Sequence, residues 1–387
     1  MKIIQYCQHV LGIGHLFRSL EICRALSDHD VILVTGGPPV DQNLPQHVRE
    51  VRLPDLQMNP EFKGLFSSRK TCTLEQIKAD RQQCLLALFE REKPDIFLVE
   101  LYPFGRKAFR FELDPVLQAL GNRLPACGAV CSVRDILVEK PDRFKHESRV
   151  VKTLNGCFDA VLVHADPRLA QLEETFEQFD EIQIPVIYTG YIAPRPKPDA
   201  GQQIRRQLQL GADEFLIIAS AGGGNVGAPL LKAVVRAFDQ LNAPNPGRLI
   251  VFSGPFLEPG DFDDLQQMAG RNVQIERFTP DFLSYLAAAD LSVSMGGYNT
   301  TMNILASGVP ALVWPFDQNQ EQRLRAGRLA QAGVLQVIQD EDLAPGRLAG
   351  RMSRLLTAPR PQPAGFALDG AANTAAWLAK RFEARQG

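Results

Sequence analysis

The stretch DLSVSMGGYNTTMNILASGVPALVWPF, residues 290–316, places a strand, a helix and a second strand in one short unit. An apolar run ends at Gly296, helix-forming residues begin near Asn299, and Gly308 precedes a second apolar run. Strands that are apolar along their whole length are typical of a parallel sheet, because each crossover places its helix over a face of the sheet. The stretch therefore predicts part of a doubly wound α/β domain.

The same alternation runs through the chain in two blocks, and the segments between the strand candidates read as helices. Pro194, Pro196 and Pro198 separate the blocks, since they exclude a helix and favour an extended connector. The strand candidates are residues 3–7, 30–36, 95–103, 126–133, 159–166, 185–192, 215–221, 248–254, 272–278, 290–296, 310–316 and 334–338.

We therefore predict an α/β protein with two doubly wound, Rossmann-like domains that face an interdomain cleft. Ligands of open parallel sheets bind outside the carboxyl ends of the strands, so the loops at those ends are expected to carry the site. The expected boundaries are 1–192 for the N-terminal domain, 193–201 for the proline-rich linker, 202–365 for the C-terminal domain and 366–387 for a terminal helix that packs back on the N-terminal domain.

The chain has 387 residues, 42 of them basic and 44 acidic, and a formal net charge of -2. No run of like charge stands out, so we expect no nucleic-acid partner. No stretch approaches the roughly 20 apolar residues that span a bilayer, and the N-terminus lacks the basic and apolar segments of a secretion signal. We therefore expect a soluble, cytoplasmic protein.

The loop GIGHLFRSL, residues 12–20, follows the first predicted strand and opens a helix. Gly12 and Gly14 permit a tight turn, and His15 falls in the first helical turn. A helix N-terminus disfavours a protonated imidazole, so His15 would stay neutral near pH 7, as a general base for a hydroxyl requires. A histidine that only caps or packs at a helix start fits the same spacing.

Two acidic residues follow predicted strands of the same domain. Glu100 ends the run DIFLVE, and Asp135 comes directly after CSVR. Either residue would orient His15 or bind an acceptor, and a purely structural role fits each of them equally well.

The loop SAGGGNVGAPLL, residues 220–231, fits the pattern G-x-G-x-x-G through Gly222, Gly224 and Gly227. It lies between a predicted strand and a predicted helix, where backbone amides would cradle a diphosphate. A dinucleotide site also needs an acidic residue at the end of the next strand, but no carboxylate appears there before Glu258. We therefore expect a phosphate loop and no bound cofactor.

The first stretch and its continuation offer two further binding groups. Asn299, Thr300 and Thr301 fall at a helix start, where the helix dipole and the first amides favour an anion. The following run DQNQEQ, residues 317–322, carries the paired donors and acceptors that sugar hydroxyls need, although a solvated helix start has the same composition.

Several of these motifs resemble the MurG-like glycosyltransferases of family 28, which are two-domain enzymes of the GT-B type. The resemblance lies in GIGHLFRSLEICRAL, MGGYNTTMNILASGVPALVWPF and EQRLRA, and it extends to FGRKAFRFEL and SVRDIL. It implies a GT-B fold in which the C-terminal domain holds a nucleotide-sugar and the N-terminal domain holds a hydroxyl acceptor.

Carried over residue by residue, the resemblance assigns His15 as the base that faces the acceptor hydroxyl, in an acceptor-side loop with Gly12 and Gly14. In the C-terminal domain it implies contacts to the donor. The implied donor-binding residues are Arg195 at a phosphate, Gly222, Gly223, Gly224 and Asn225 in the loop that opens the domain, Phe278 at the nucleobase, Gly297, Tyr298, Asn299 and Thr300 at the diphosphate, and Glu321 and Gln322 at the sugar hydroxyls.

The chain departs from the family pattern at Asn303, where a glutamate is expected to accept both ribose hydroxyls of a uridine nucleotide. Asparagine accepts through one carbonyl oxygen and carries no charge. Loss of a charged bidentate contact costs on the order of 1 to 3 kcal/mol. A UDP-sugar is the default donor by resemblance, and Asn303 weakens that expectation.

The resulting interpretation is a metal-independent, inverting glycosyltransferase of the hexosyltransferase type, since the chain has no DxD-type pair in a strand-end loop. Two helix starts, at 222–227 and 297–301, would take the place of a cation and stabilise the leaving diphosphate. A nucleotide-sugar hydrolase and a non-catalytic nucleotide-sugar-binding protein are the alternatives. The aromatic and basic run at 58–70 suits a membrane that carries a lipid-linked acceptor, but an ordinary loop is favoured.

Overall fold

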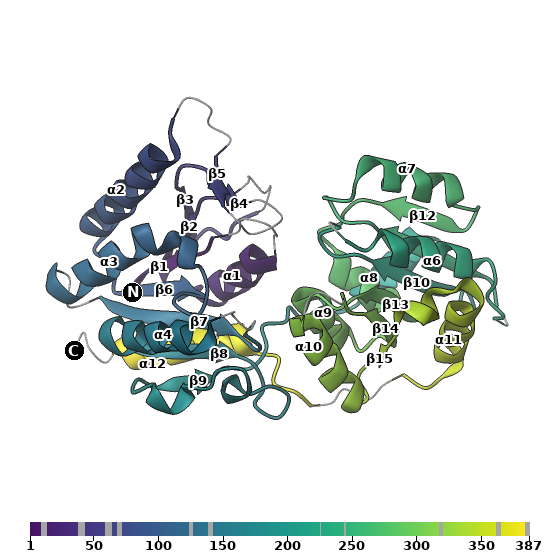
Figure 1. The fold of residues 1–387 in the computed structure, drawn as a ribbon. Coiled ribbons are helices and arrows are strands. Elements are labelled where there is room, and N and C mark those ends of the chain that lie inside the picture. Colours follow the sequence, from purple (N-terminus) through teal and green to yellow (C-terminus); the bar gives the residue numbers. More distant parts are fainter. Residues whose placement is uncertain are drawn as a thin grey trace. The chain divides into compact units, whose positions relative to one another are not determined.

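The computed structural model divides into two compact units, each built around one parallel sheet (Figure 1). The first unit comprises Met1–Ile192 and Ala367–Gly387, and the second comprises Ala193–Phe366. The structure describes residues 1–8, 14–37, 43–58, 64–67, 72–123, 127–137, 142–224, 226–243, 245–316, 320–360 and 365–383.

The first unit contains a seven-stranded parallel sheet of order β3-β2-β1-β6-β7-β8-β9. The order reverses between β1 and β6, so the carboxyl ends of these two strands form the switch point where ligands of doubly wound sheets bind. The strands are β1 (Lys2–Tyr6), β2 (Asp30–Thr35), β3 (Val48–Arg52), β6 (Ile96–Glu100), β7 (Gly128–Arg134), β8 (Ala160–His164) and β9 (Val186–Tyr188). A separate antiparallel pair joins β4 (Gln57–Met58) and β5 (Leu65–Phe66).

Helices cover both faces of this sheet. The core on one face includes Leu16 and Leu20 of the first helix together with Leu378 and Phe382 of the last. A Cβ at Gly128 would lie 2.1 Å from the Phe382 ring, so this glycine lets the last helix lie against the start of β7. The helices are α1 (Gly14–Ala25), α2 (Leu74–Glu92), α3 (Arg110–Arg123), α4 (Arg143–Cys157) and α12 (Gly370–Phe382), with 3-10 turns η1 (Lys107–Phe109), η2 (Leu172–Glu174) and η3 (Phe179–Glu181).

The returning chain is fastened to the end of the first block. Ile192 forms an antiparallel bridge with Asp369, and the Tyr191 amide donates to the Ala367 carbonyl at 2.8 Å. The Ala367 amide donates in turn to Asp166 Oδ2 at 2.9 Å. Residues 367–383 therefore belong to the first unit although the second unit lies between them and residue 192 in the sequence.

The second unit has a six-stranded parallel sheet of order β12-β11-β10-β13-β14-β15, whose switch point lies between β10 and β13. Its strands are β10 (Phe215–Ser220), β11 (Gly247–Phe252), β12 (Val273–Glu276), β13 (Leu291–Met295), β14 (Ala311–Trp314) and β15 (Gln336–Val337). Its helices are α5 (Ala200–Gln207), α6 (Ala228–Phe238), α7 (Pro259–Met268), α8 (Phe282–Ala288), α9 (Tyr298–Ser307), α10 (Gln320–Gln331) and α11 (Pro345–Thr357), with the 3-10 turn η4 (Asp340–Leu343).

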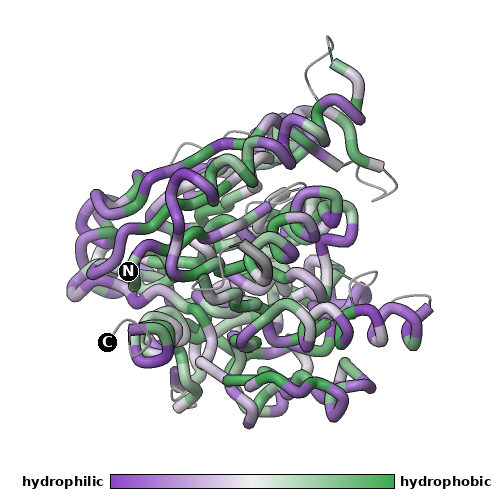
Figure 2. The backbone as a smooth tube through the Cα atoms, turned by 90° about the vertical axis from the view of Figure 1, so that its left-hand side faces the viewer, coloured by the Kyte–Doolittle hydropathy of each residue, from purple (hydrophilic) through white to green (hydrophobic). Residues whose placement is uncertain are grey.

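The sheets carry the core of each unit, and their central strands are buried along their length. Hydrophobic and hydrophilic residues alternate along the helices, as expected for helices with one face on a core (Figure 2). No helix among the described residues is both long enough and apolar enough to cross a membrane.

Candidate functional site

His15 and Glu100 meet at the switch point of the first unit. His15 is the second residue of α1, which follows β1, and Glu100 is the last residue of β6. Because β1 and β6 are paired in register, the loop after one strand comes beside the end of the other. His15 Nδ1 lies 2.6 Å from Glu100 Oε1. A carboxylate at this distance accepts the Nδ1 proton, which leaves the lone pair on Nε2.

Two arginines hold the Glu100 carboxylate, which is only 2% exposed. Arg18 Nη2 donates to Glu100 Oε1 at 2.5 Å, and Arg106 Nη2 donates to Glu100 Oε2 at 3.2 Å. Arg18 Nη2 also lies 3.1 Å from His15 Nδ1. The carboxylate is thus bonded through both of its oxygens.

The charges at this switch point set the protonation of both groups. Burial lowers the pKa of His15 to about 3, and Arg106 and Arg18 act in the same direction, against the opposing effect of Glu100. Burial alone would raise the pKa of Glu100, but His15, Arg106 and Arg18 outweigh it and hold that pKa well below its usual range. At neutral pH the imidazole is therefore neutral and the carboxylate ionised, with the His15 side chain 21% exposed.

Asp135 occupies a different place. It is fully buried directly after β7, the strand next to β6. Among the described residues, His15 donates to Glu100 and forms no hydrogen bond with Asp135. Gly14 is the first residue of α1, whereas Gly12 lies outside the described residues.

Sequence reasoning missed Arg18 and Arg106. Arg18 stands three residues after His15 on α1, a spacing that places both side chains on one face, so the sequence contained a signal for it. Arg106 lies in the loop after β6, where it has a left-handed backbone with φ of 57°. The residue spacing in a loop does not show which side chains turn back toward the strand end. The contact of Arg106 with Glu100 could therefore be found only in the structure.

In the second unit the glycine loop after β10 packs backbone to backbone on the loop after β11. Gly224 has φ of 93°, and a Cβ there would lie 2.7 Å from the Ser253 carbonyl oxygen. The Gly254 amide donates to the Arg277 carbonyl at 2.9 Å, which ties in the segment after β12. A Cβ at Gly222 would meet nothing within 4 Å, so this side of the loop is open.

The second predicted phosphate-binding segment follows β13, the neighbour of β10 at the switch point. Helix α9 begins at Tyr298, with Gly297 as its extended N-cap and without a side-chain cap. Thr301 donates its hydroxyl to the Gly297 carbonyl at 3.0 Å, whereas Thr300 is 8% exposed beside the helix start. The positive end of the α9 dipole and the glycine loop therefore lie at neighbouring strand ends.

Glu321 and Gln322 are held at the start of α10. Glu321 is buried and accepts from Arg325 Nη2 at 2.5 Å, and the Arg325 guanidinium stands 5.0 Å from the centre of the Tyr298 ring. Gln322 Oε1 accepts from the Phe316 amide at 3.1 Å at the end of β14. The first set of contacts places Glu321 beside the start of α9, and the second places Gln322 at the end of β14.

The remaining donor-site predictions are more scattered. Phe278, just after β12, is 50% exposed, and Asn303 is half-buried within α9. Arg195 is exposed ahead of α5, whereas Asn225 lies outside the described residues, as do 317–319 and most of 58–70. The described residues contain no group of three or more His, Cys, Asp or Glu side chains that would hold a metal ion.

Residues 221–376 match the glycosyltransferase family 28 C-terminal domain. The chain is 23% identical over 226 residues to an uncharacterized glycosyltransferase of Methanopyrus kandleri, covering 57% of this chain and 62% of the relative. It is 27% identical over 151 residues to UDP-N-acetylglucosamine--N-acetylmuramyl-(pentapeptide) pyrophosphoryl-undecaprenol N-acetylglucosamine transferase of Caldicellulosiruptor saccharolyticus, covering 38% and 40%. The aligned part thus spans less than two thirds of either relative.

Solved structures resemble the chain over its whole length. The calicheamicin glycosyltransferase CalG4 superposes with a TM-score of 0.61 and 17% identity, covering 99% of this chain and 97% of that protein. MurG of Acinetobacter baumannii does so with a TM-score of 0.58 and 15% identity, covering 99% and 100%. The predicted fold class and the resemblance to MurG-like proteins are thereby confirmed: the chain has two parallel α/β sheets and the GT-B fold, and its residues 221–376 match the glycosyltransferase family 28 C-terminal domain.

Proposed function

We propose that this chain transfers a sugar from a nucleotide-sugar donor to a hydroxyl acceptor, with His15 as general base. The observation that carries the proposal is the His15–Glu100 pair, in which the neutral imidazole donates from Nδ1 and keeps a lone pair on Nε2. A base that must accept a hydroxyl proton needs this protonation state at neutral pH. The first unit would bind the acceptor, and the second unit would bind the donor.

The donor assignment rests on the second unit. The glycine loop at Gly222–Gly224 and the start of α9 stand at neighbouring strand ends, and both suit a diphosphate. The curated Caldicellulosiruptor relative is named for UDP-N-acetylglucosamine, which makes a UDP-sugar the default donor. Asn303 stands where the family pattern has a carboxylate at the ribose, so sugars linked to other nucleotides are candidate donors beside UDP-sugars.

The proposed reaction is a single displacement. Nε2 of His15 takes the proton of the acceptor hydroxyl, whose oxygen forms a bond to the anomeric carbon of the sugar. The bond from that carbon to the diphosphate oxygen breaks, and the nucleoside diphosphate leaves with the electron pair. Attack opposite to the leaving group inverts the anomeric centre.

Charge is balanced at both ends of this displacement. The ionised Glu100 stabilises the imidazolium that forms on His15. The start of α9 and the glycine loop stabilise the charge that develops on the diphosphate. His15 then returns its proton to solvent.

A nucleotide-sugar hydrolase is the second candidate, because the same base would deprotonate a water molecule as readily as a sugar hydroxyl. Product analysis with and without acceptor alcohols separates the two functions. Transfer predicts a glycoside, whereas hydrolysis predicts the free sugar in both reactions.

The experiment starts with a thermal-shift screen of UDP-, dTDP-, GDP- and ADP-linked sugars, since a true donor stabilises the chain by mass action. Release of nucleoside diphosphate from the best donor is then measured for the wild type, His15→Gln and the control His29→Gln. His15→Gln is expected to lower kcat by about 10²- to 10⁴-fold with the donor-induced shift unchanged. Equal turnover in His15→Gln and the wild type would refute His15 as the base.

A further inference from the structure

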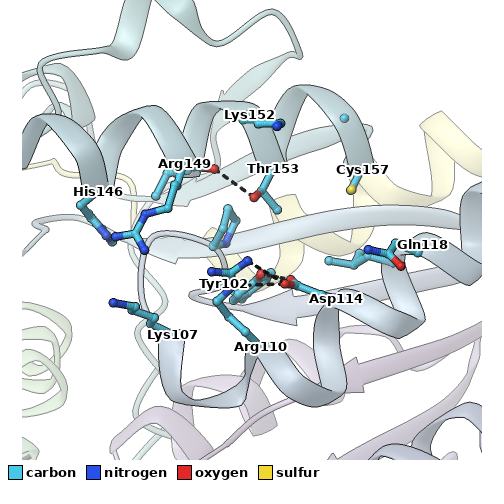
Figure 3. Close-up of a pocket in the computed structure, with 14 residues that line it drawn as sticks. Tyr102, Lys107, Arg110, Asp114, Gln118, His146, Arg149, Lys152, Thr153 and Cys157 are labelled. Carbon is cyan, nitrogen blue, oxygen red and sulfur yellow. Dashed lines mark hydrogen bonds and ion pairs between the residues drawn. The ribbon is translucent and has the colours of Figure 1, made fainter.

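The first unit contains a pocket between α3 and α4 that the proposed reaction does not use (Figure 3). Its volume is about 500 Å³, and its walls come from the loop after β6, the turn η1 and the facing sides of the two helices. Neither His15 nor Glu100 lines it. The pocket is therefore a separate feature of this unit.

Positive charge dominates the lining. Four of the lining residues, Lys107, Arg110, Arg149 and Lys152, are cationic, and Asp114 is the lining carboxylate. That carboxylate already accepts from Arg110 Nη2 at 2.9 Å and from the Tyr102 hydroxyl. The pocket thus keeps a strong excess of positive charge.

The other three cations have no carboxylate to neutralise them within the described part of the chain. Arg149 Nε donates to the carbonyl of Lys145 at 3.2 Å, and no ion pair is formed by Lys107 or Lys152. Like charges that share a concave surface repel one another and raise the local concentration of anions. An anion would relieve this repulsion.

Part of the positive charge is gathered at one end of the pocket. Figure 3 shows Lys107, His146 and Arg149 gathered at one end, with Gln118 and Cys157 at the other. His146 is held in place by a contact of 3.1 Å from its Nε2 to the Phe104 carbonyl, which fixes its ring on the wall. The contact between the loop after β6 and α4 therefore gives the cationic end a defined shape.

The pocket also has apolar lining residues. The buried side chains of Leu117 and Val150 line the pocket, and Gln118 adds an amide at its edge. Thr153 is half-buried and donates its hydroxyl to the Arg149 carbonyl at 2.9 Å. The lining thus combines cationic side chains with buried apolar side chains, and it also includes Lys152 and the Arg110–Asp114 pair.

We propose that this pocket binds a small organic phosphate, with the phosphate between Lys107 and Arg149 and the organic part over Leu117 and Val150. An arginine fork and a lysine ammonium match the oxygens of a phosphate monoester, which carries close to two negative charges at pH 7. A single carboxylate would leave more of the excess charge unbalanced. The binding site is independent of the donor site of the second unit.

The test uses the full chain, calorimetric titration and phenyl phosphate as the probe. We expect saturable binding to the wild type, at least about tenfold weaker binding to the double variant K107Q/R149Q, and unchanged binding to K145Q. Lys145 lies on the same helix as Arg149, is exposed and does not line the pocket, so it is a matched control. Phenol is expected not to bind, because it lacks the phosphate.

Equal affinity of K107Q/R149Q and the wild type would overturn the proposal, since the ester would then bind elsewhere, for example at the glycine loop of the second unit. Capture on vesicles that contain phosphatidic acid, without binding of the soluble ester, would overturn it as well. Thermal unfolding of the double variant is measured in parallel. Both side chains reach solvent, so a folded protein with weakened binding is the expected result.

Discussion

Replacing Glu100 with glutamine tests the charge arrangement around His15. Glu100 is 2% exposed and balances Arg18 and Arg106, whose side chains are 3% and 11% exposed. Removing one partner of a buried ion pair leaves the other charge uncompensated, at a cost of about 3 to 5 kcal/mol. Glutamine keeps one acceptor oxygen, so we expect Glu100→Gln to lower the unfolding free energy of the first unit by about 3 kcal/mol.

The pH dependence of this loss has a defined sign. The pKa of Glu100 in the folded chain lies well below its usual range, so the carboxylate stabilises the fold at pH values above the unfolded pKa. That stabilisation is lost as the pH falls through the folded pKa. The difference between wild type and variant is therefore expected to be constant from about pH 6 to pH 8 and to shrink below about pH 4.5.

The two tryptophans allow the units to be followed separately, because Trp377 lies in the first and Trp314 in the second. In a Trp314→Phe background, urea unfolding monitored by Trp377 fluorescence reports on the first unit. The control is Glu75→Gln, whose side chain is 80% exposed and pairs with Lys78, so its loss is expected to be below about 1 kcal/mol. Equal stabilities of Glu100→Gln and Glu75→Gln would refute the reasoning.

Two further predictions concern the proposed base and the phosphate loop. Because the pKa of His15 is lowered to about 3, kcat/KM for donor turnover is expected to show no acid limb near pH 6.5, and a limb there that disappears in His15→Gln would contradict this. Gly224 has φ of 93°, and a Cβ there would lie 2.7 Å from the Ser253 carbonyl oxygen, so Gly224→Ala is expected to destabilise the second unit by about 2 to 3 kcal/mol. Gly222 also has a positive φ, but a Cβ there would meet no atom within 4 Å, so Gly222→Ala is expected to cost about 1 kcal/mol. Trp314 fluorescence during unfolding measures both, and equal losses would contradict the role of the close approach to Ser253.

The strands were largely predictable because the buried ones are mostly apolar. β3, Val48–Arg52, was not predicted for a physical reason: it is an edge strand, and its sequence VREVR has only two valines among three charged residues that are exposed or partly exposed. The linker was expected to extend to residue 201, but α5 begins at Ala200, because the last of the spaced prolines is Pro198 and nothing after it prevents a helix.

The sequence nominates single residues for the candidate site but does not pair them. His15 and Glu100 are 85 residues apart in the sequence, and their contact depends on β1 pairing with β6 rather than with β7. Strand order cannot be read from hydrophobic pattern, so the sequence left Glu100 and Asp135 with the same alternative roles. The order of the sheet brings Glu100 to His15 and leaves Asp135 one strand further along.

The contacts at Glu100 also explain how one small cluster meets two opposed electrostatic requirements. A general base must be neutral at working pH, which calls for positive charge or burial beside the imidazole, whereas the group that orients it must stay ionised despite burial. Arg18 and Arg106 meet both requirements, because each lowers the pKa of His15, which keeps the imidazole neutral, and the pKa of Glu100, which keeps the carboxylate ionised. A lone buried glutamate would raise the pKa of the imidazole and would itself tend to protonate. The arginines are therefore as much a part of the proposed base as the histidine, although neither is expected to touch the substrate.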